Sequence, residues 1–147
     1  MARLTQNYDT RATLVPFNDV ITSENSIGSN GYTGHTGTFI APIDGIYVFH
    51  SHVLKCQKTA APLFLNLLHN DRMVASATNH DSLFETTSMS AVLSMAKGDA
   101  VAVKLRTGVI YGRTANHYST FSGFYLGPRD TNTARKILPN KHRSKYL

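Results

Sequence analysis

Residues 45–57 read GIYVFHSHVLKCQ, a stretch dense in apolar side chains that also carries two histidines one residue apart. On a β-strand, side chains two residues apart point to the same face, so His50 and His52 would lie side by side. Two imidazoles on one face are a starting set for a metal site. The stretch predicts a long strand and leaves two interpretations open: a metal-binding strand of an enzyme, or an ordinary strand of a binding domain.

The chain on either side of this stretch has the same short-strand character. Gly, Asn, Asp and Pro interrupt it at short intervals, and most segments between them have a period of two or are rich in β-forming residues. The pattern predicts strands over residues 12–22, 38–41, 45–56, 62–69, 73–78, 86–96, 100–107 and 119–127, with a further strand and loop over 108–118. Tight turns are expected at Asn70-Asp71 and at KGD, residues 97–99. We therefore expect a single all-β domain, a two-sheet sandwich or jelly roll.

Composition is that of a folded protein. The 147 residues are 41% hydrophobic and 16% charged, which argues against a disordered chain. No apolar run approaches the roughly 20 residues of a membrane helix, so no membrane insertion is expected. The N-terminus has no apolar h-region, and no signal peptide is visible. The single cysteine, Cys56, excludes an intrachain disulfide and a Cys-based zinc cluster.

The net charge of +6 is concentrated at the C-terminus. Residues 129–147 contain six Lys or Arg and one Asp, whereas the rest of the chain is close to neutral. A basic tail attracts anionic partners, although a solvated terminal extension is the simpler interpretation. Nucleic-acid binding is not expected, because the cations are in the tail and most aromatics are in strand-like segments.

The sharpest enzyme hypothesis is a cupin-like metal site. Gly45 followed by His50 and His52 resembles part of the cupin metal motif. The carboxylate that should follow is missing, however, since no acid occurs between His52 and Asp71. Iron and manganese sites of this type need that ligand. A metalloenzyme using His50 and His52 is therefore the least favoured of the functions considered.

Other catalytic patterns are weaker still. Cys56 lies too far along the strand from His52 for proton transfer between them, and no serine nucleophile motif or phosphate loop occurs. Asp99 in KGD is expected to cap a turn. Asp81 and Glu85 lie close together in one loop and leave a calcium site open. No other cofactor is expected.

The order of aromatics and glycines resembles the globular-head domain of complement C1q. The motif runs from Tyr32 through Phe39 to Gly45-x-Tyr47-x-Phe49. It continues in NLLHND (66–71), in SMSAVLSMAKGDAVAVKL (88–105) and in the final YSTFSGFYL (118–126). The resemblance covers residues 15–126. The chain departs from the pattern in SENSIGSNG (23–31), which contains extra residues.

The resemblance implies a ten-stranded jelly roll similar to tumour necrosis factor, assembled as a homotrimer. The expected division is an N-terminal segment 1–12, a globular domain 13–127 and a basic extension 128–147. It also implies a secreted, non-enzymatic recognition protein, without the collagen stalk that many members carry. The residues expected in the core or in trimer packing are Phe17, Tyr32, Phe39, Gly45, Tyr47, Phe49, Phe121, Gly123 and Phe124.

Two functions follow from this resemblance. The first is a trimeric lectin of innate immunity that binds microbial carbohydrates or other patterned surfaces, and the second is a signalling ligand for a protein receptor. Ligand contacts are expected in the loops at the ends of the sandwich, where donors and aromatic faces occur together. The candidate ligand-binding residues are Asn79, His80, Tyr111, Arg113, Asn116, His117 and Tyr118.

Overall fold

The computed structural model describes residues 1–21, 31–57, 60–80 and 84–130. Within these ranges every regular element is a strand, which confirms the all-β prediction. The described ranges contain eleven strands: β1 (Ala2–Arg3), β2 (Thr13–Leu14), β3 (Asp19–Val20), β4 (Tyr32–Thr33), β5 (Thr38–Ile40), β6 (Gly45–Leu54), β7 (Leu63–His69), β8 (Arg72–Asn79), β9 (Thr86–Met95), β10 (Ala100–Thr107) and β11 (Thr120–Gly127).

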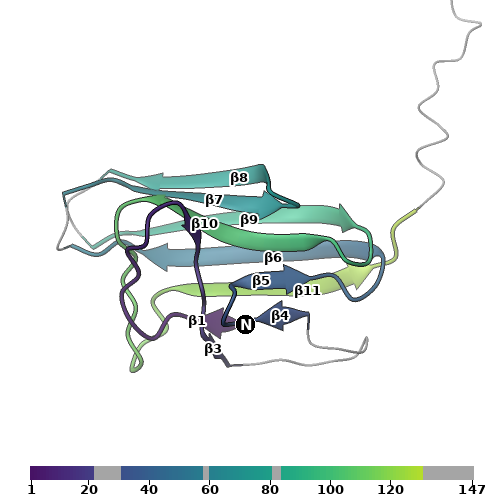
Figure 1. Cartoon of the computed structure of the whole chain (residues 1–147), viewed down its shortest axis with the longest axis horizontal. Helices are drawn as coiled ribbons and strands as arrows, with labels where there is room; N and C mark the ends of the chain where they lie inside the picture. Colours follow the sequence, from purple (N-terminus) through teal and green to yellow (C-terminus); the bar gives the residue numbers. More distant parts are fainter. Residues whose placement is uncertain (22–30, 58–59, 81–83, 131–147) are drawn as a thin grey trace, which may run out of the picture.

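The strands form two stacked antiparallel sheets (Figure 1). The five-stranded sheet has the order β3-β1-β11-β6-β9. The six-stranded sheet has the order β4-β5-β10-β7-β8, with β2 paired to β10 beside this path. Most neighbours in space are distant in sequence, as in a jelly roll.

Strand β6 lies between β11 and β9 and shows how the sequence forms the core. Tyr47, Phe49 and Val53 are each 1% exposed, whereas His50 is exposed. Because alternate side chains of a strand point to opposite faces, His50 and His52 lie on the outer face of the five-stranded sheet. The two histidines are therefore outside the hydrophobic core.

A cluster of aromatic rings fills the space between the sheets. Phe49 stacks on Phe121 with ring centroids 5.9 Å apart, and Phe39 meets Phe49 edge-on at 5.2 Å. Phe121 also stacks on Phe17 at 5.9 Å, and Tyr47 stacks on Phe49 at 6.2 Å. Such pairs contribute about 0.5–1.5 kcal/mol each beyond the burial of their area. This cluster joins both sheets into one core.

The remaining core candidates lie in different environments. Tyr32 is half-buried against the core and donates its hydroxyl to the Phe17 carbonyl at 3.3 Å, while burial raises its pKa. At Gly123 an added Cβ would come within 2.7 Å of the Phe49 ring, so a larger residue would displace that ring. Phe124 is not in the core of the protomer, because it is 60% exposed.

The predicted strand over residues 12–22 is wrong in one respect: it is two short strands in different sheets. β2 pairs with β10 of the six-stranded sheet, and β3 pairs with β1 of the five-stranded sheet. Pro16 lies between them and has no N–H to donate to a ladder. Its neighbours Val15 and Phe17 are buried as the chain crosses from one sheet to the other.

The N-terminal segment 1–12, which the resemblance places outside the globular domain 13–127, packs into the sandwich. Its strand β1 pairs with β11 on one side and with β3 on the other. Ala2 is 2% exposed and Leu4 is 3% exposed, and both belong to the core cluster. The domain therefore includes this segment.

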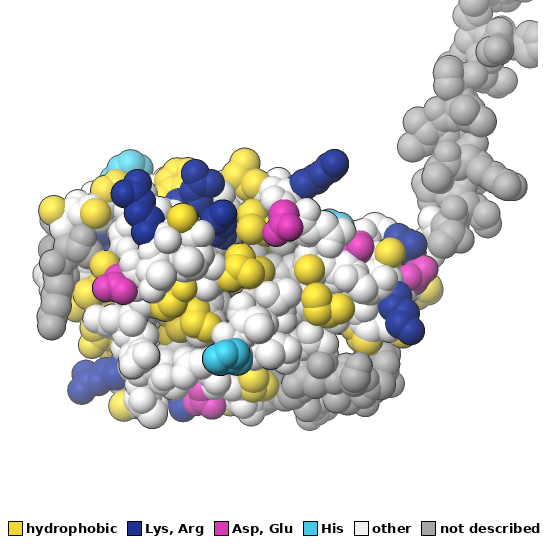
Figure 2. All heavy atoms as spheres, in the orientation of Figure 1, with side chains coloured by type: hydrophobic (Ala, Val, Ile, Leu, Met, Phe, Trp, Pro, Cys, Tyr) yellow, Lys and Arg dark blue, Asp and Glu magenta, His cyan; other side chains and the backbone are white. Residues whose placement is uncertain are grey.

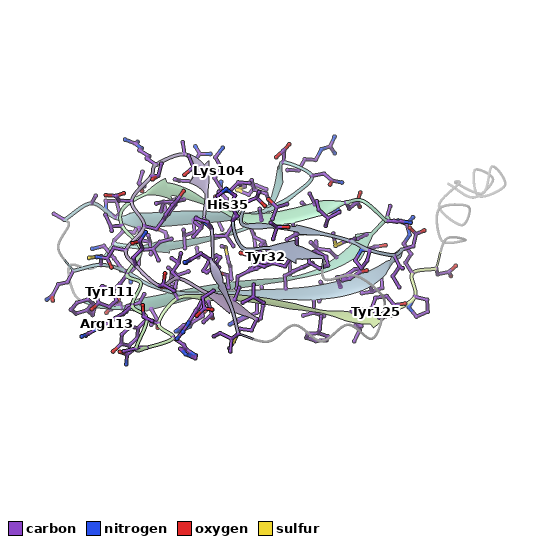
Figure 3. All side chains as sticks on the ribbon, turned by 60° about the horizontal axis from the view of Figure 1, so that its bottom comes forward. Tyr32, His35, Lys104, Tyr111, Arg113 and Tyr125 are labelled. Carbon is purple, nitrogen blue, oxygen red and sulfur yellow. The ribbon has the colours of Figure 1, made fainter. Side chains whose placement is uncertain are left out.

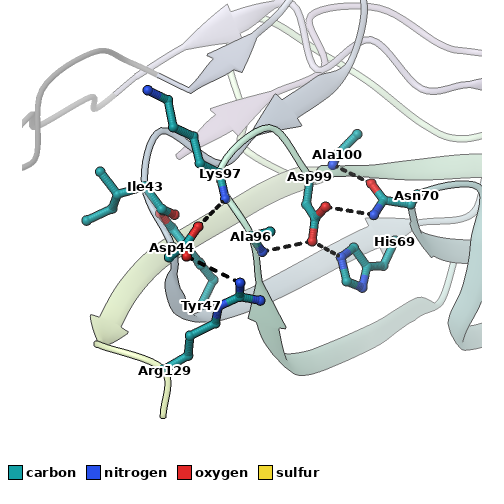
Figure 4. Close-up of polar contacts among 10 residues, drawn as sticks. All are labelled: Ile43, Asp44, Tyr47, His69, Asn70, Ala96, Lys97, Asp99, Ala100 and Arg129. Atoms are coloured by element: carbon teal, nitrogen blue, oxygen red, sulfur yellow. Dashed lines mark hydrogen bonds and ion pairs between the residues drawn. The ribbon is translucent and has the colours of Figure 1, made fainter. Parts of the chain in front are cut away.

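At one end of the sandwich Asp99 connects two hairpin turns (Figure 4). Its carboxylate accepts hydrogen bonds from the Asn70 side chain and the Ala96 N–H, each at 2.9 Å, and pairs with His69 at 3.0 Å. These contacts, led by the Asn70 hydrogen bond, lower the pKa of Asp99 to about 2. Asp99 thus caps its turn, as expected, and also holds the β7–β8 turn at Asn70-Asp71, where both residues have positive φ.

Asp99→Asn is expected to lower the free energy of unfolding by about 1–2 kcal/mol at pH 5, because two charge-assisted hydrogen bonds and an ion pair are weakened. The folded-state pKa lies below the ordinary 3.8, so the contribution is present above pH 3.8 and is lost as pH falls through about 2. Urea unfolding measures the difference in unfolding free energy between Asp99→Asn and the parent protein. This difference should be smaller at pH 3 than at pH 5. Asp71→Asn in the neighbouring turn is the control, with a change below about 0.5 kcal/mol. An equal difference at both pH values would contradict this role for Asp99.

Candidate ligand-binding site

One end of the sandwich carries an open hollow of about 750 Å³. Two segments that are distant in sequence form it: the chain that follows β1, and the loop between β10 and β11. Figure 3 shows Tyr111 and Arg113 projecting at this end of the domain. The lining residues are Thr5, Gln6, Asn7, Tyr111, Gly112, Arg113, Thr114 and Ala115. The lining surface is therefore about as apolar as it is polar, and Arg113 is the charged member of this lining.

The loop is held at its base by a buried serine. Ser119 is fully buried; its hydroxyl donates to the Tyr111 carbonyl at 2.7 Å and accepts the N–H of Leu54 at 3.1 Å. Tyr111 in turn donates its N–H to the Leu54 carbonyl at 2.8 Å. Both ends of the loop are thus fixed to the end of β6, which limits how far Tyr111 can move.

The N-terminal segment is fixed to the same loop and forms the opposite wall of the hollow. The Asn7 side chain accepts the Gly112 N–H at 3.1 Å. Arg3 donates to the Thr114 carbonyl at 2.7 Å and is paired with Asp19 at 2.6 Å. These contacts hold the two walls together without using the Arg113 side chain, which stays exposed.

A row of three aromatic rings lies beside the hollow. Tyr111 is in the middle, with Phe84 at 5.4 Å and Tyr118 at 5.6 Å between ring centroids. Phe84 is 49% exposed and Tyr118 is 37% exposed, so the row presents ring surface to solvent. The row therefore offers apolar ring surface next to the hollow.

The structure brings some of the predicted site residues together and separates others. Tyr111 and Arg113 line the hollow, and Tyr118 belongs to the aromatic row. The Asn116 N–H donates to the Arg113 carbonyl at 3.3 Å and closes the loop tip, and His117 is exposed beyond it.

The two predicted residues at the end of β8 differ from this group. Asn79 is 7% exposed and pairs with Leu63 in the six-stranded sheet, so its side chain is not a free ligand contact. His80, directly after it, is exposed. Sequence reasoning missed Phe84 and the Thr5–Asn7 wall. Phe84 directly precedes Glu85 and could have been found with it, whereas nothing in the sequence connects residues 5–7 to residues 111–115.

The described part of the chain offers little for a metal ion. It contains no group of three or more His, Cys, Asp or Glu side chains placed to hold one. Of the calcium candidates, Asp81 lies outside the described residues, and Glu85 is exposed while its carbonyl accepts the Lys55 N–H at 3.0 Å. His52 is 3.2 Å from the Ser88 hydroxyl.

The strands flanking the histidine pair are polar but uncharged at these positions. His50 lies opposite Ser90 on β9 and Ser122 on β11. The pair therefore has no carboxylate opposite it on either neighbouring strand. Cys56 is 2% exposed and within 3.7 Å of the Asn7 side-chain nitrogen, which is the environment of a structural thiol. Among the described residues, no helix of the length and hydropathy needed to cross a membrane is found.

A second surface of interest is the outer face of the five-stranded sheet. Phe124 on β11 lies opposite Val48 on β6, which lies opposite Val92 on β9. Val92 is 66% exposed, Phe124 is 60% exposed and Leu126 is 61% exposed. We call Val48, Val92, Phe124 and Leu126 the apolar face. Large apolar side chains grouped in this way typically mark a protein–protein contact.

Comparison with known proteins adds a family assignment. The family model described as "C1q domain" matches residues 1–126. Caprin-2 of Danio rerio is 43% identical over 93 residues, which is 62% of this chain and 10% of that protein. Complement C1q tumor necrosis factor-related protein 3 of Mus musculus is 32% identical over 128 residues, which is 86% of this chain and 50% of that protein. The chain thus spans half or less of the length of these curated relatives.

Solved structures agree on the fold. The globular domain of zebrafish complement 1qA protein superimposes with a TM-score of 0.65 at 22% identity, covering 86% of this chain and 96% of that chain. The Eiger TNF of S. frugiperda superimposes with a TM-score of 0.61 at 13% identity, covering 87% of this chain and 90% of that one. At these identities the likeness concerns the jelly-roll fold.

Proposed function

The chain belongs to the C1q domain family, and on that premise we propose that it is a secreted, trimeric recognition protein that binds carbohydrates at the end of the sandwich. The observation that carries this proposal is the hollow with Arg113 in its lining, placed directly beside the exposed aromatic row. A catalytic role for His50 and His52 is set aside, because the C1q and tumour necrosis factor relatives are non-enzymatic signalling or recognition proteins.

The chemistry of the hollow suits a sugar. Sugar rings have apolar C–H faces that pack on aromatic rings and hydroxyl groups that need hydrogen-bond partners. Phe84 and Tyr118 supply the aromatic rings. Arg113 supplies hydrogen-bond donors in a fixed geometry for hydroxyl or carboxylate oxygens. Because Ser119 and Asn7 fix the walls, little additional ordering is needed when a ligand binds.

The proposed trimer rests on the apolar face. We propose that further copies of this chain cover the apolar face. Membership of the C1q domain family and three apolar side chains that are at least 60% exposed both favour such self-association. Three hollows carried on one assembly would also compensate for weak single sites. When several sites of about millimolar affinity bind one surface together, the overall affinity increases by a factor of about 10² or more.

The alternative is a ligand for a protein receptor. It is supported by the name of the relative described as a tumor necrosis factor-related protein and by the Eiger TNF fold match. In this case the hollow would contact a protein side chain instead of a sugar. Binding to a cell-surface protein that is unaffected by removal of its glycans would favour this alternative.

Arg113→Ala and Tyr118→Ala are each expected to weaken glycan binding about tenfold or more, because each removes a direct ligand contact. The measurement is a glycan array on the full chain, followed by titration of the best ligand. Lys97→Ala is the control, since Lys97 is exposed in the β9–β10 turn and outside the hollow, and it should bind as the parent does. Equal binding by all three variants would exclude the hollow as the glycan site, and an array without any bound glycan would contradict the lectin proposal.

A further inference from the structure

Two histidines lie beside the apolar face, on the same outer side of the five-stranded sheet. His50 is two residues from Val48 on β6, so the two side chains point the same way and are about 6.5 Å apart. His52 continues the row by two further residues. His50 is exposed in the protomer, whereas His52 is half-buried with its Nδ1 atom 3.2 Å from the Ser88 hydroxyl. His50 thus adjoins the apolar face directly.

An interface built on the apolar face would cover His50 as well. A standard protein–protein interface covers about 800 Å² of each partner, a patch roughly 30 Å across. His50 is only two residues along the strand from Val48, well inside that width. Its neighbours on β9 and β11 are Ser90 and Ser122, whose short side chains leave room for another copy to approach. On the premise of the proposed trimer, the His50 imidazole is therefore removed from water when copies associate.

The surroundings of His50 give a protonated imidazole no partner of opposite charge on the paired strands. Among the described residues, the positions opposite the two histidines on β9 and β11 are all uncharged: Ser88, Ser90, Thr120 and Ser122. The four residues of the apolar face carry no carboxylate either. Charged groups farther out are the Arg3–Asp19 ion pair, the α-amino group of Met1, Glu85 before β9 and the buried Lys55 after β6. A positive charge on His50 would therefore be buried in the contact without a carboxylate from its own copy.

We propose that His50 makes the assembly of copies depend on pH, so that the trimer is stable while this imidazole is neutral and dissociates when it is protonated. Histidine side chains ordinarily gain their proton at about pH 6.5. A neutral imidazole beside serine hydroxyls can be buried at modest cost, whereas burying an unpaired cation is strongly unfavourable. Protons therefore bind more weakly to the trimer than to separate copies. Association is complete above about pH 6.5 and is lost as the pH falls below it.

Mild acid does not weaken the described contacts of the other histidines. His69 is paired with Asp99, whose pKa of about 2 leaves the carboxylate ionised at pH 5.5, so protonation of His69 strengthens that ion pair. His35, His80 and His117 are exposed to solvent. Figure 2 shows the histidine side chains on the face that it presents as isolated groups, without a second histidine beside them. The expected effect of mild acid is therefore the separation of folded copies.

The test measures the dissociation constant of the trimer for the full chain and two variants, by sedimentation equilibrium at pH 7.5 and pH 5.5. EDTA is present throughout, so that the histidine pair cannot act through a metal ion. Because a trimer contains three copies of His50, its dissociation takes up about three protons. The parent constant should therefore rise by up to about 10³-fold per pH unit below about pH 6.5.

The two variants each remove one histidine. His50→Gln keeps a polar side chain that gains no proton, so its dissociation constant should change about tenfold or less between the two pH values. His35→Gln is the matched control, because it removes an exposed histidine from the β4–β5 turn of the other sheet (Figure 3). This variant should dissociate in acid as the parent protein does. Tyrosine fluorescence and thermal unfolding at pH 5.5 check that the separated copies are still folded.

The outcomes separate this inference from the proposed trimer. A parent protein that is equally trimeric at both pH values would overturn the role of His50 and leave the trimer intact. A parent protein that is monomeric at both would contradict the trimer, and this inference with it. Equal pH dependence in both variants would assign the effect to net charge and overturn the proposal. Tighter association at pH 5.5 would also overturn it, because a neighbouring copy would then supply a carboxylate to His50. Unfolding of the parent protein at pH 5.5 would overturn it by making dissociation a loss of fold.

Discussion

Phe124→Asp is expected to convert the proposed trimer into a monomer of 16.2 kDa. The substitution introduces a carboxylate into the apolar face, where Phe124 lies next to Val48 on the neighbouring strand. Burying an unpaired charge costs several kcal/mol, and a trimer would bury it three times. The protomer itself should fold normally, because Phe124 is 60% exposed and contributes little to the core. Sedimentation or light scattering measures the mass directly, and thermal unfolding checks the fold.

Met73→Asp is the matched control for this experiment. Met73 is 61% exposed, almost the same as Phe124, but it is on β8 of the other sheet. The variant should keep the mass of the parent protein. If the Phe124→Asp variant is still a trimer, the contact between copies lies on another surface. A parent protein that sediments as a monomer would contradict the proposed assembly itself.

Phe49→Ala is expected to lower the free energy of unfolding by about 3–5 kcal/mol, the range for removing a buried aromatic ring. Phe49 is 1% exposed and is within 6.2 Å, between ring centroids, of Phe39, Tyr47 and Phe121. Removing it leaves a cavity between the sheets that neither can close without moving its strands. A loss of this size is a large fraction of the stability of a small domain. Urea unfolding followed by tyrosine fluorescence measures it.

His50→Ala tests the same strand on its other face. The residues are adjacent, but His50 is exposed and makes no contact with the aromatic cluster. The change in unfolding free energy should stay below about 0.5 kcal/mol. If the two substitutions cost the same, the assignment of inner and outer faces of β6 would be wrong.

The agreement between sequence and structure can be traced to particular residues. Alternation in residues 45–54 and the turn at Asn70-Asp71 are local signals, and both predicted elements are present. Residues 100–107 form the predicted strand without any shift of its ends. Each of these depends on neighbours within a few positions, which is the range over which periodicity and turn chemistry act.

The parts that could not be predicted depend on distant contacts. Residues 12–22 look like one strand, but the sheet that each half joins is decided by β10 and β1. The hollow needs residues 5–7 beside residues 111–115, and no local signal in either segment indicates the other. Asn79 looks like a loop residue in the sequence, yet its pairing with Leu63 extends β8 by one position and buries it.

The pairing of β1 with β11 also determines when the domain can be completed. It joins residues 2–3 to residues 120–121, and β3 is attached to the sheet through β1. Contacts between such distant segments form slowly, since a long loop must close first. During synthesis the first strands to be made therefore wait without their partner until nearly all of the domain has been translated. β11 also carries Phe124, so the apolar face is completed in the same late step, and an unfinished chain lacks the surface by which copies would associate.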